Sequence, residues 1–263
     1  MNPWVAGGSG LGLICLIFAA AWMFARRWDN YSIVDAVWAL GIGLLGVLWL
    51  AACGDGSPKI LLAGGMLLMW SLRLGLHLER RIRRAHPEED ARYAKLREVW
   101  TGRVPAAFFW FFQGQAVSVA LLALPFLLIA VDSDRSWSFW ESAGLAVTLI
   151  GISGEALADA QMSRFKSGKP GASEICREGL WRYSRHPNYF FESVIWLGFY
   201  TYACGSAWGW TTFHAPVIIT FLLLKVTGIP PTEASAVRRK GDAYRLYQKT
   251  TSAFIPWPPK RLG

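Results

Sequence analysis

The side chains best suited to chemistry in this sequence are ionisable groups within or at the ends of long apolar runs. They are Asp35, Arg73, His77, Glu155, Asp159 and Glu192. Inside a membrane span such a group costs roughly 2.5 to 3.5 kcal/mol on insertion scales unless it faces protein or water, so each one is a functional candidate. All six fall toward the same ends of their runs, which predicts a shared polar cavity. Snorkelling or ion pairing between helices is the structural alternative for any single residue.

The sharpest local pattern is RHPNY at residues 185–189, with Glu192 three residues further on. Pro187 suits the first turn of a helix, so Asn188, Tyr189 and Glu192 would project from the N-terminal end of that helix. Backbone N–H groups and the helix dipole at such an end, with arginines alongside, favour a phosphate or carboxylate. A capped loop that enters the membrane is the structural alternative.

A second basic pattern lies near the C-terminus. Glu233 is followed by the basic run 238–240 and then by Tyr244 and Tyr247. A polar helix over 233–249, ended by the prolines of IPWPP, would present an acid, bases and aromatic rings to a nucleotide. As a bare charge run, the same segment would form a solvated or lipid-facing surface.

Several other kinds of site are excluded by what the sequence lacks. No GxGxxG follows a strand, and no Walker A, HExxH or GxSxG motif occurs. The four cysteines form no CxxC pair and accompany no histidine cluster, so no metal site is expected. A nucleotide, if bound, must therefore lie in a helical cavity.

Apolar segments must position these groups, because 53% of the chain is hydrophobic, the mean hydropathy is +0.28 and there are 15 Trp. Runs long enough to cross a bilayer lie at about 5–25, 32–52, 60–78, 106–131, 138–158, 189–205 and 209–228. Of the 27 Lys and Arg residues, 23 fall in alternate loops, whereas Lys59 lies on the opposite side. The pattern predicts an all-α integral membrane protein of about seven transmembrane helices, with the N-terminus outside and the C-terminus cytoplasmic. The sixth run is the weakest, and no domain boundary is evident in 1–263.

RHPNYxxE, the C-terminal pattern, NYSIVDAVW at 30–38 and WSLRLGLHLERR at 70–81 together resemble the steroid 5α-reductase family. The resemblance spans nearly the whole chain and is nearest to a bacterial branch that was formerly a domain of unknown function. It implies a monomeric multi-pass enzyme of the bacterial inner membrane that takes NADPH from the cytoplasm. The enzyme would reduce the Δ4 double bond of a 3-oxo-steroid or a similar lipid enone.

The resemblance also implies roles for individual residues. Asn188 and Glu192 match residues that line the nicotinamide and the substrate, and a cavity is expected mainly from 155–250 with 30–80. The expected cofactor-binding residues are Glu155, Asp159, Arg164, Lys166, Arg182, Tyr183, Arg185, His186, Asn188, Tyr189, Glu233, Arg238 and Tyr244. The expected catalytic residues are Asp35, Arg73, His77 and Glu192.

Asp35 appears in the position of a membrane glutamate that, with a tyrosine, polarises the steroid ketone in the animal reductases. The segment WSLRLGLHLER holds no tyrosine, so Arg73 or His77 is expected to replace it. Hydride addition to an enone requires a donor about 3 Å from the carbonyl oxygen to stabilise the developing charge. An apolar cavity would favour the protonated form of Asp35, whereas Arg73 nearby would favour the charged form, and the sequence leaves both open.

Two other functions compete with this interpretation. The RHPxY pattern also occurs in sterol reductases and in isoprenylcysteine carboxyl methyltransferases, so an S-adenosylmethionine-dependent methyltransferase acting on a lipid is the main alternative. The many basic residues favour NADPH, which carries three phosphates. A lipid-binding or transport protein without catalysis is the third possibility, although no inverted repeat is evident. The net charge of +9 follows the predicted topology, so membrane lipid and not nucleic acid is the expected partner.

Overall fold

The computed structural model describes residues 2–132, 134, 136–168, 171 and 174–260. Regular structure in these ranges is helical, with one isolated bridge between Ser184 and Ser252. The chain forms two compact units. The first contains the residues up to Glu141 together with Ala203–Thr212, and the second contains Ser142–Tyr202 and the residues from Phe213 onward. The prediction of an all-α protein is confirmed for the described residues.

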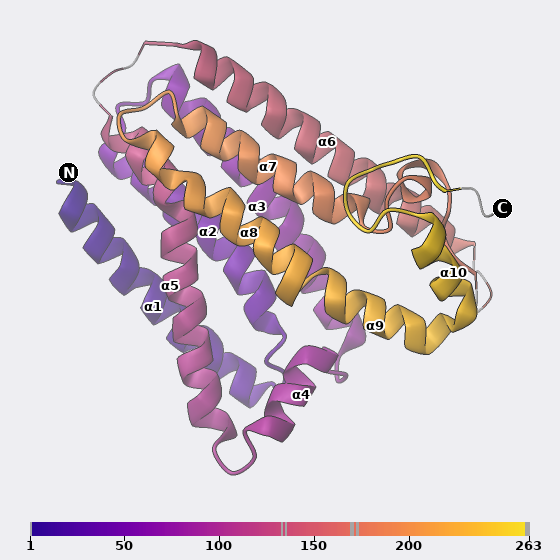
Figure 1. Ribbon diagram of the computed structural model, residues 1–263. Helices are drawn as coiled ribbons and strands as arrows, with labels where there is room; N and C mark the ends of the chain where they lie inside the picture. The colour runs from indigo at the N-terminus through magenta and orange to yellow at the C-terminus, as the bar shows by residue number, and fades with distance from the viewer. Residues whose placement is uncertain (1, 133, 135, 169–170, 172–173, 261–263) are drawn as a thin grey trace. The chain divides into compact units, whose positions relative to one another are not determined.

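The first unit is a helical bundle built around α2 (Figure 1). Its helices are α1 (Pro3–Arg27), α2 (Ile33–Cys53), α3 (Pro58–Ala85), α4 (Ala91–Val99) and α5 (Val104–Val131). α2 packs against α1, α3 and α5. A Cβ on Gly46 of α2 would lie 2.4 Å from Cδ2 of Leu67 in α3, so the absence of a side chain lets these helices approach closely.

The second unit begins within α6 (Phe139–Ser167) and continues through η1 (Gly179–Arg182) and α7 (Pro187–Ala203). The chain then forms α8 (His214–Phe221), a π-helical segment η3 (Leu222–Val226), α9 (Ile229–Lys240) and α10 (Asp242–Thr250). α6 and α7 are antiparallel, because Gly144 faces Tyr202 and Gly151 faces Ile195 (Figure 1). A Cβ on Gly144 would lie 2.3 Å from the backbone nitrogen of Tyr202, so the two backbones are nearly in contact.

Six helical segments of the described chain are long and apolar enough to cross a bilayer. They are Pro3–Arg27, Ile33–Cys53, Pro58–Ala85, Val104–Val131, Phe139–Ser167 and Gly209–Lys240. These segments support a multi-pass membrane protein. α7, predicted as the weakest span, has 17 residues and a length of about 25 Å, against about 30 Å of hydrocarbon. The count of seven spans and the orientation of the termini therefore stay predictions.

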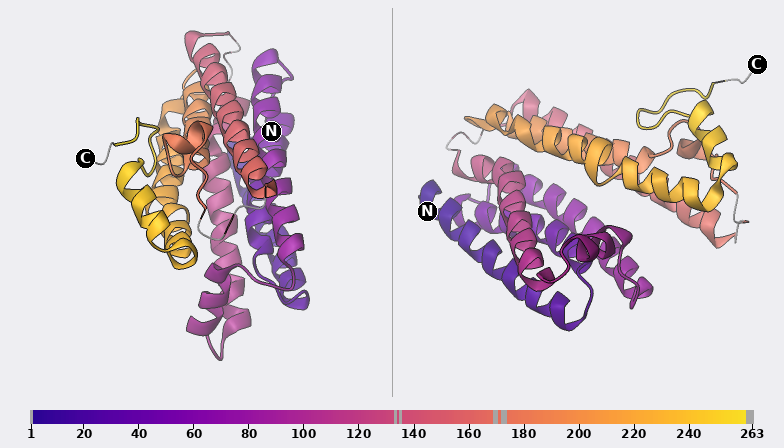
Figure 2. Two further views of the ribbon diagram at one scale, coloured as in Figure 1. Left: turned by 90° about the vertical axis from the view of Figure 1, so that its right-hand side faces the viewer. Right: turned by 60° about the horizontal axis from the view of Figure 1, so that its bottom comes forward.

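Two predicted boundaries on the basic side are corrected. The helix that contains the apolar run 138–158 extends further than that run, because α6 continues to Ser167. The expected helix over 233–249 is broken at Gly241, which has a positive φ of +55° that disfavours other residues. α10 turns away from α9 at this glycine and ends before IPWPP, as predicted (Figure 2). The predicted helix start at Pro187 is confirmed.

A buried ion cluster connects several segments of the first unit on the side where Lys59 was predicted. The Lys59 side chain is 1% exposed, and its Nζ lies 2.8 Å from Oε1 of Glu141 and 3.4 Å from Oδ2 of Asp132. Nζ also donates to the carbonyl oxygen of Gly205 at 2.7 Å. The cluster joins the first turn of α3, the end of α5, the start of α6 and the 203–212 segment.

Candidate functional site

The NYS segment before α2 is buried and holds the chain that follows α3. The backbone N–H of Tyr31 donates to Oε1 of Glu89 at 2.6 Å, and the backbone N–H of Asp90 donates to Oγ of Ser32 at 2.9 Å. The guanidinium of Arg97 lies over the Tyr31 ring at 4.7 Å and binds Glu89 at 2.6 Å. The first half of the NYSIVDAVW motif therefore holds α4 and the residues directly before it in place.

Asp35, in the first turn of α2, is the centre of a polar cluster in the first unit. Its Oδ2 lies 2.6 Å from Nη2 of Arg92, and its Oδ1 accepts a 2.5 Å hydrogen bond from the hydroxyl of Tyr93. A second cation, Arg81, lies 3.8 Å from the same carboxylate. Asp90 caps the N-terminus of α4 and binds Nε of Arg92 at 2.9 Å. Asp35 thus accepts hydrogen bonds from Arg92 and Tyr93.

Burial and charge decide the protonation of the two groups on α4. Burial and the neighbouring charge of Asp35 raise the pKa of the Tyr93 phenol well above its usual value of 10.0. Burial alone would lower the pKa of Arg92, but the carboxylates of Asp35 and Asp90 raise it above its ordinary value. Tyr93 therefore keeps its proton and Arg92 keeps its charge at neutral pH. The neutral hydrogen-bond donor of this cluster is thus the phenol hydroxyl of Tyr93.

The partners of Asp35 differ from those expected. Among the described residues, the ion-pair partners of Asp35 are Arg92 and Arg81, whereas Arg73 and His77 lie on α3. Tyr93 is the tyrosine that is hydrogen-bonded to Asp35, and sequence reasoning missed it. The only available signal was Asp90, an acid that could cap a helix two residues before Arg92 and three before Tyr93.

In the second unit, Arg185 joins the RHPNY motif to the C-terminal segment by an ion pair and hydrogen bonds. The Arg185 side chain is 9% exposed, and its Nε binds Oε1 of Glu233 at 2.6 Å. Its Nη1 donates to the carbonyl oxygens of Gln248 and Thr251. Its backbone N–H donates to the carbonyl oxygen of Ser252 at 2.8 Å. Sequence reasoning assigned Arg185 and Glu233 to the cofactor, and the structure joins them to each other.

The histidine and tyrosine of the motif lie against the same acid. Nε2 of His186 is 3.3 Å from Oε1 of Glu233, and the His186 ring stacks on Tyr189 at 5.3 Å. Gln248 donates to the other oxygen of Glu233 at 2.8 Å. Tyr244 is buried nearby, where burial and the charge of Glu233 raise the pKa of its phenol to about 12. These residues form one connected polar cluster beside the start of α7.

Asn188 carries a polar atom that this cluster does not satisfy. Its side-chain oxygen Oδ1 is shielded from solvent and accepts no hydrogen bond from the described residues. Leaving such an atom buried without a partner costs about 1 to 3 kcal/mol, so a bound ligand that donates a hydrogen bond would remove this cost. Glu192, one turn along α7, is buried and accepts a hydrogen bond of 2.9 Å from Nε1 of Trp196.

Comparison with known proteins identifies the family. The family model described as a protein of unknown function, DUF1295, matches residues 21–251. The chain belongs to the DUF1295 family. This family is related to steroid 5α-reductase-like proteins. An uncharacterized protein of Schizosaccharomyces pombe, C594.04c, is 24% identical over 97% of this chain and 80% of its own length.

The remaining predicted residues of this DUF1295 protein lie around the same segments. Glu155 and Asp159 are one turn apart on α6, and Arg164 and Lys166 are exposed in the last turn of that helix. Arg182 and Tyr183 are exposed at the end of η1, and Arg238 is exposed in the last turn of α9. Asp35, Arg73 and His77 belong to the first unit, whereas Glu155, Asp159 and Glu192 belong to the second. The single cavity expected for these six groups stays a prediction.

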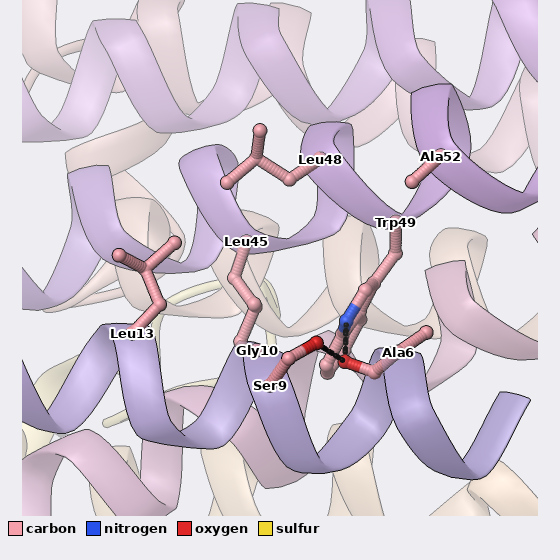
Figure 3. Close-up of a pocket in the computed structure, with 8 residues that line it drawn as sticks. All are labelled: Ala6, Ser9, Gly10, Leu13, Leu45, Leu48, Trp49 and Ala52. Atoms are coloured by element: carbon pink, nitrogen blue, oxygen red, sulfur yellow. Dashed lines mark hydrogen bonds between the residues drawn. The ribbon is translucent and has the colours of Figure 1, made fainter. Parts of the chain in front are cut away.

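The first unit contains an apolar pocket of about 200 Å³ whose lining is unsuited to polarising the carbonyl group of an enone (Figure 3). It lies between α1 and α2 and is lined by Ala6, Ser9, Gly10, Leu13, Leu45, Leu48, Trp49 and Ala52. Its polar groups are already paired, since Nε1 of Trp49 and Oγ of Ser9 both donate to the carbonyl oxygen of Ala6. The pocket offers no ionisable group that could polarise a carbonyl. Within the described ranges, no cluster of His, Cys, Asp and Glu is arranged for a metal ion either.

Proposed function

We propose that this protein is an NADPH-dependent reductase that saturates the double bond of a lipid enone, with 3-oxo-4-ene steroids as the leading substrate class. The observation that carries the proposal is the hydrogen bond from Tyr93 to Asp35. A tyrosine paired with a carboxylate is the arrangement that the steroid 5α-reductase resemblance requires, and the 70–81 segment does not provide it. Membership of a family related to steroid 5α-reductase-like proteins supports the same chemistry.

In this proposal, Tyr93 stabilises negative charge on the carbonyl oxygen of the substrate. Its raised pKa keeps the phenol protonated at neutral pH, so it can donate a hydrogen bond to an oxygen that becomes more basic as the reaction proceeds. Without substrate, Asp35 accepts the single proton of the phenol, and Arg92 and Arg81 form ion pairs with the other oxygen of Asp35. When the enone binds, the hydroxyl turns this proton from Asp35 to the carbonyl oxygen. Asp35 is then a positioning residue, which revises its expected role as the acid.

The residues of the second unit suit a nucleotide. Asn188 provides a shielded amide oxygen without a hydrogen-bond partner among the described residues, as an amide or hydroxyl donor of a cofactor would require. Arg164, Lys166 and Arg238 are exposed cations that would bind phosphates, whereas Arg185, His186 and Glu233 hold the cluster together. When bound, NADPH would supply the hydride. The remaining groups would orient the dinucleotide and keep Asn188 in place.

Cofactor identity separates this proposal from a methyltransferase. A ligand that binds only the folded protein raises its unfolding temperature by mass action. We expect NADPH to stabilise the purified protein in a concentration-dependent way and S-adenosylmethionine to have no effect. The opposite result would favour methyl transfer, and stabilisation by neither compound would argue against both enzymes.

Activity is tested by following NADPH absorbance with a panel of 4-en-3-one steroids and shorter lipid enones. The expected result is loss of NADPH with formation of the saturated ketone, identified by mass spectrometry. Binding of the enone without NADPH consumption would contradict the reductase proposal and favour a lipid-binding function.

A further inference from the structure

A basic pocket lies in the second unit, and Arg182 is its one residue that is also among the expected cofactor-binding residues. It has a volume of about 340 Å³ and is lined by Arg177, Arg182, Thr250, Thr251, Pro259 and Lys260. Three of these six residues are cations, two carry hydroxyls and none is acidic. The pocket therefore combines the side chains that usually bind phosphate groups.

The three cations have no acidic partner of their own. Within the described part of the chain, no carboxylate lies within ion-pair distance of Arg177, Arg182 or Lys260. Arg177 lies over the ring of the buried Tyr247 at 5.5 Å, and Tyr247 in turn donates to the carbonyl oxygen of Trp181. Gathering like charges around one pocket is unfavourable unless an anion compensates them.

Thr251 contributes a hydroxyl to the lining of the pocket. The residue is 7% exposed and lines the pocket. Its backbone groups bond to Tyr247 and Arg185, but its side-chain hydroxyl forms no hydrogen bond with the described residues. A hydroxyl in such a position can donate to a phosphate oxygen.

The end of α10 would repel an anion if its carbonyl oxygens were free, because a helix C-terminus carries partial negative charge. These oxygens are already engaged. The carbonyls of Gln248 and Thr251 accept hydrogen bonds from Arg185, and that of Thr250 accepts one of 2.8 Å from the backbone N–H of Lys260. The same bonds hold the end of α10 and the segment around Lys260 in place. These carbonyl oxygens therefore do not compete with an anion for the cations of the pocket.

We propose that this pocket binds a phosphate group, carried either by the headgroup of an anionic lipid or by a soluble phosphate compound. The guanidinium groups of Arg177 and Arg182 bind the phosphate oxygens, Lys260 adds a third charge and the Thr251 hydroxyl donates a hydrogen bond. Arg182 is shared with the expected cofactor-binding residues, but the test does not rest on the reductase reaction, because binding is measured without nicotinamide cofactor or enone.

The test uses the purified full-length protein in neutral detergent and follows its unfolding temperature. One arm adds inorganic phosphate at constant ionic strength set with chloride, and the other adds phosphatidic acid against phosphatidylcholine. We expect saturable stabilisation in at least one arm. Stabilisation by phosphatidic acid alone identifies a lipid headgroup, and stabilisation by phosphate alone identifies a soluble ligand. No saturable effect in either arm overturns the proposal.

Variants locate the effect. The double variant Arg177→Ala/Arg182→Ala should weaken binding by about tenfold or more, because it removes two charged hydrogen-bond donors. Lys95→Ala/Lys249→Ala removes the same charge from exposed sites outside the pocket and should leave binding unchanged. Thr251→Val keeps the shape of the side chain and should weaken binding by about threefold to tenfold. Equal weakening by the control and the pocket variant would show that overall charge, and not this pocket, binds the anion.

Discussion

The hydroxyl of Tyr93 lies 2.5 Å from Oδ1 of Asp35, although 58 residues separate them in the chain. α4 carries the phenol to the start of α2 because the NYS segment and Arg97 hold α4 in place. The segment between the apolar helices α3 and α5, which contains α4, thereby brings a hydrogen-bond donor to a carboxylate at the start of α2.

Replacing Tyr93 with phenylalanine tests this donor. Tyr93→Phe keeps the ring but removes the proton, and loss of one donor to a developing oxyanion lowers kcat by about 100-fold to 1000-fold. We expect a loss of this size in NADPH consumption with a 4-en-3-one. The unfolding temperature should fall only modestly, since a hydrogen bond to an ion-paired carboxylate contributes about 1.5 to 3 kcal/mol.

Tyr31→Phe is the matched control. Tyr31 is buried in the same region and stacks on Phe108 with ring centroids 3.7 Å apart, but its hydroxyl makes no hydrogen bond with the described residues. The Tyr31→Phe variant should consume NADPH at nearly the wild-type rate. If both variants retain full turnover, Tyr93 is not the donor and its bond to Asp35 is only structural.

The pH dependence of reduction should reflect the raised pKa of Tyr93. Burial and the charge of Asp35 raise this pKa above 10.0, so the protonated phenol is fully present below that value and is lost only as the pH rises through the raised pKa. The rate should therefore show no decline caused by Tyr93 between about pH 6 and 9. A decline within that range that disappears in Tyr93→Phe would contradict the assignment.

The sequence predicted those features that depend on local pattern. The helix start at Pro187 follows from the fixed φ of proline, and the long apolar runs follow from the length that a bilayer requires. The continuous helix over 233–249 was wrong because the backbone of Gly241 takes a positive φ, which many glycines inside helices do not. Local pattern thus predicted where helices occur better than where they break.

Contacts between distant segments were not predictable from the same patterns. Arg185 and Glu233 both have types suited to a nucleotide site, but residue type does not show that they bind each other at 2.6 Å. Tyr93 lies in a polar segment with no apolar run to mark it, and only the fold brings it to Asp35. Residue types suited to a site can therefore be recognised in the sequence, whereas the partner of each residue cannot.

Removing the carboxylate of Glu233 should destabilise the second unit. Glu233→Ala leaves the buried guanidinium of Arg185 without its acid, which typically costs about 3 to 5 kcal/mol. Glu233→Gln keeps a hydrogen-bond acceptor and should lose less. The unfolding temperature in detergent measures both. Asp242→Ala is the control, because the Asp242 side chain is 99% exposed and 3.9 Å from Arg245, so its loss should have almost no effect.

Asn188→Ala should weaken NADPH binding without loss of stability. The variant removes a shielded oxygen that has no hydrogen-bond partner among the described residues, so the unliganded protein should be at least as stable as the wild type. Titration of NADPH against unfolding temperature should show a dissociation constant raised by about tenfold. Ser193→Ala, on the same helix, removes only a local bond to the Tyr189 carbonyl oxygen and should bind NADPH normally. Identical affinities for the three proteins would exclude Asn188 from the cofactor site.

The Lys59 cluster should be the most sensitive polar feature of the first unit. Lys59→Met leaves the fully buried carboxylate of Glu141 without its cation, and we expect a loss of about 3 to 5 kcal/mol. Lys59→Met/Glu141→Leu removes both charges of this pair and should recover part of that stability, because no charge of the pair stays buried alone. Gly205→Ala should also destabilise the unit, since the added Cβ would lie 1.8 Å from Oε1 of Glu141. Unfolding temperatures of the three variants in detergent provide the comparison, with the exposed Lys95→Met as control. If Lys59→Met unfolds at the wild-type temperature, the ion pair does not hold these helices together.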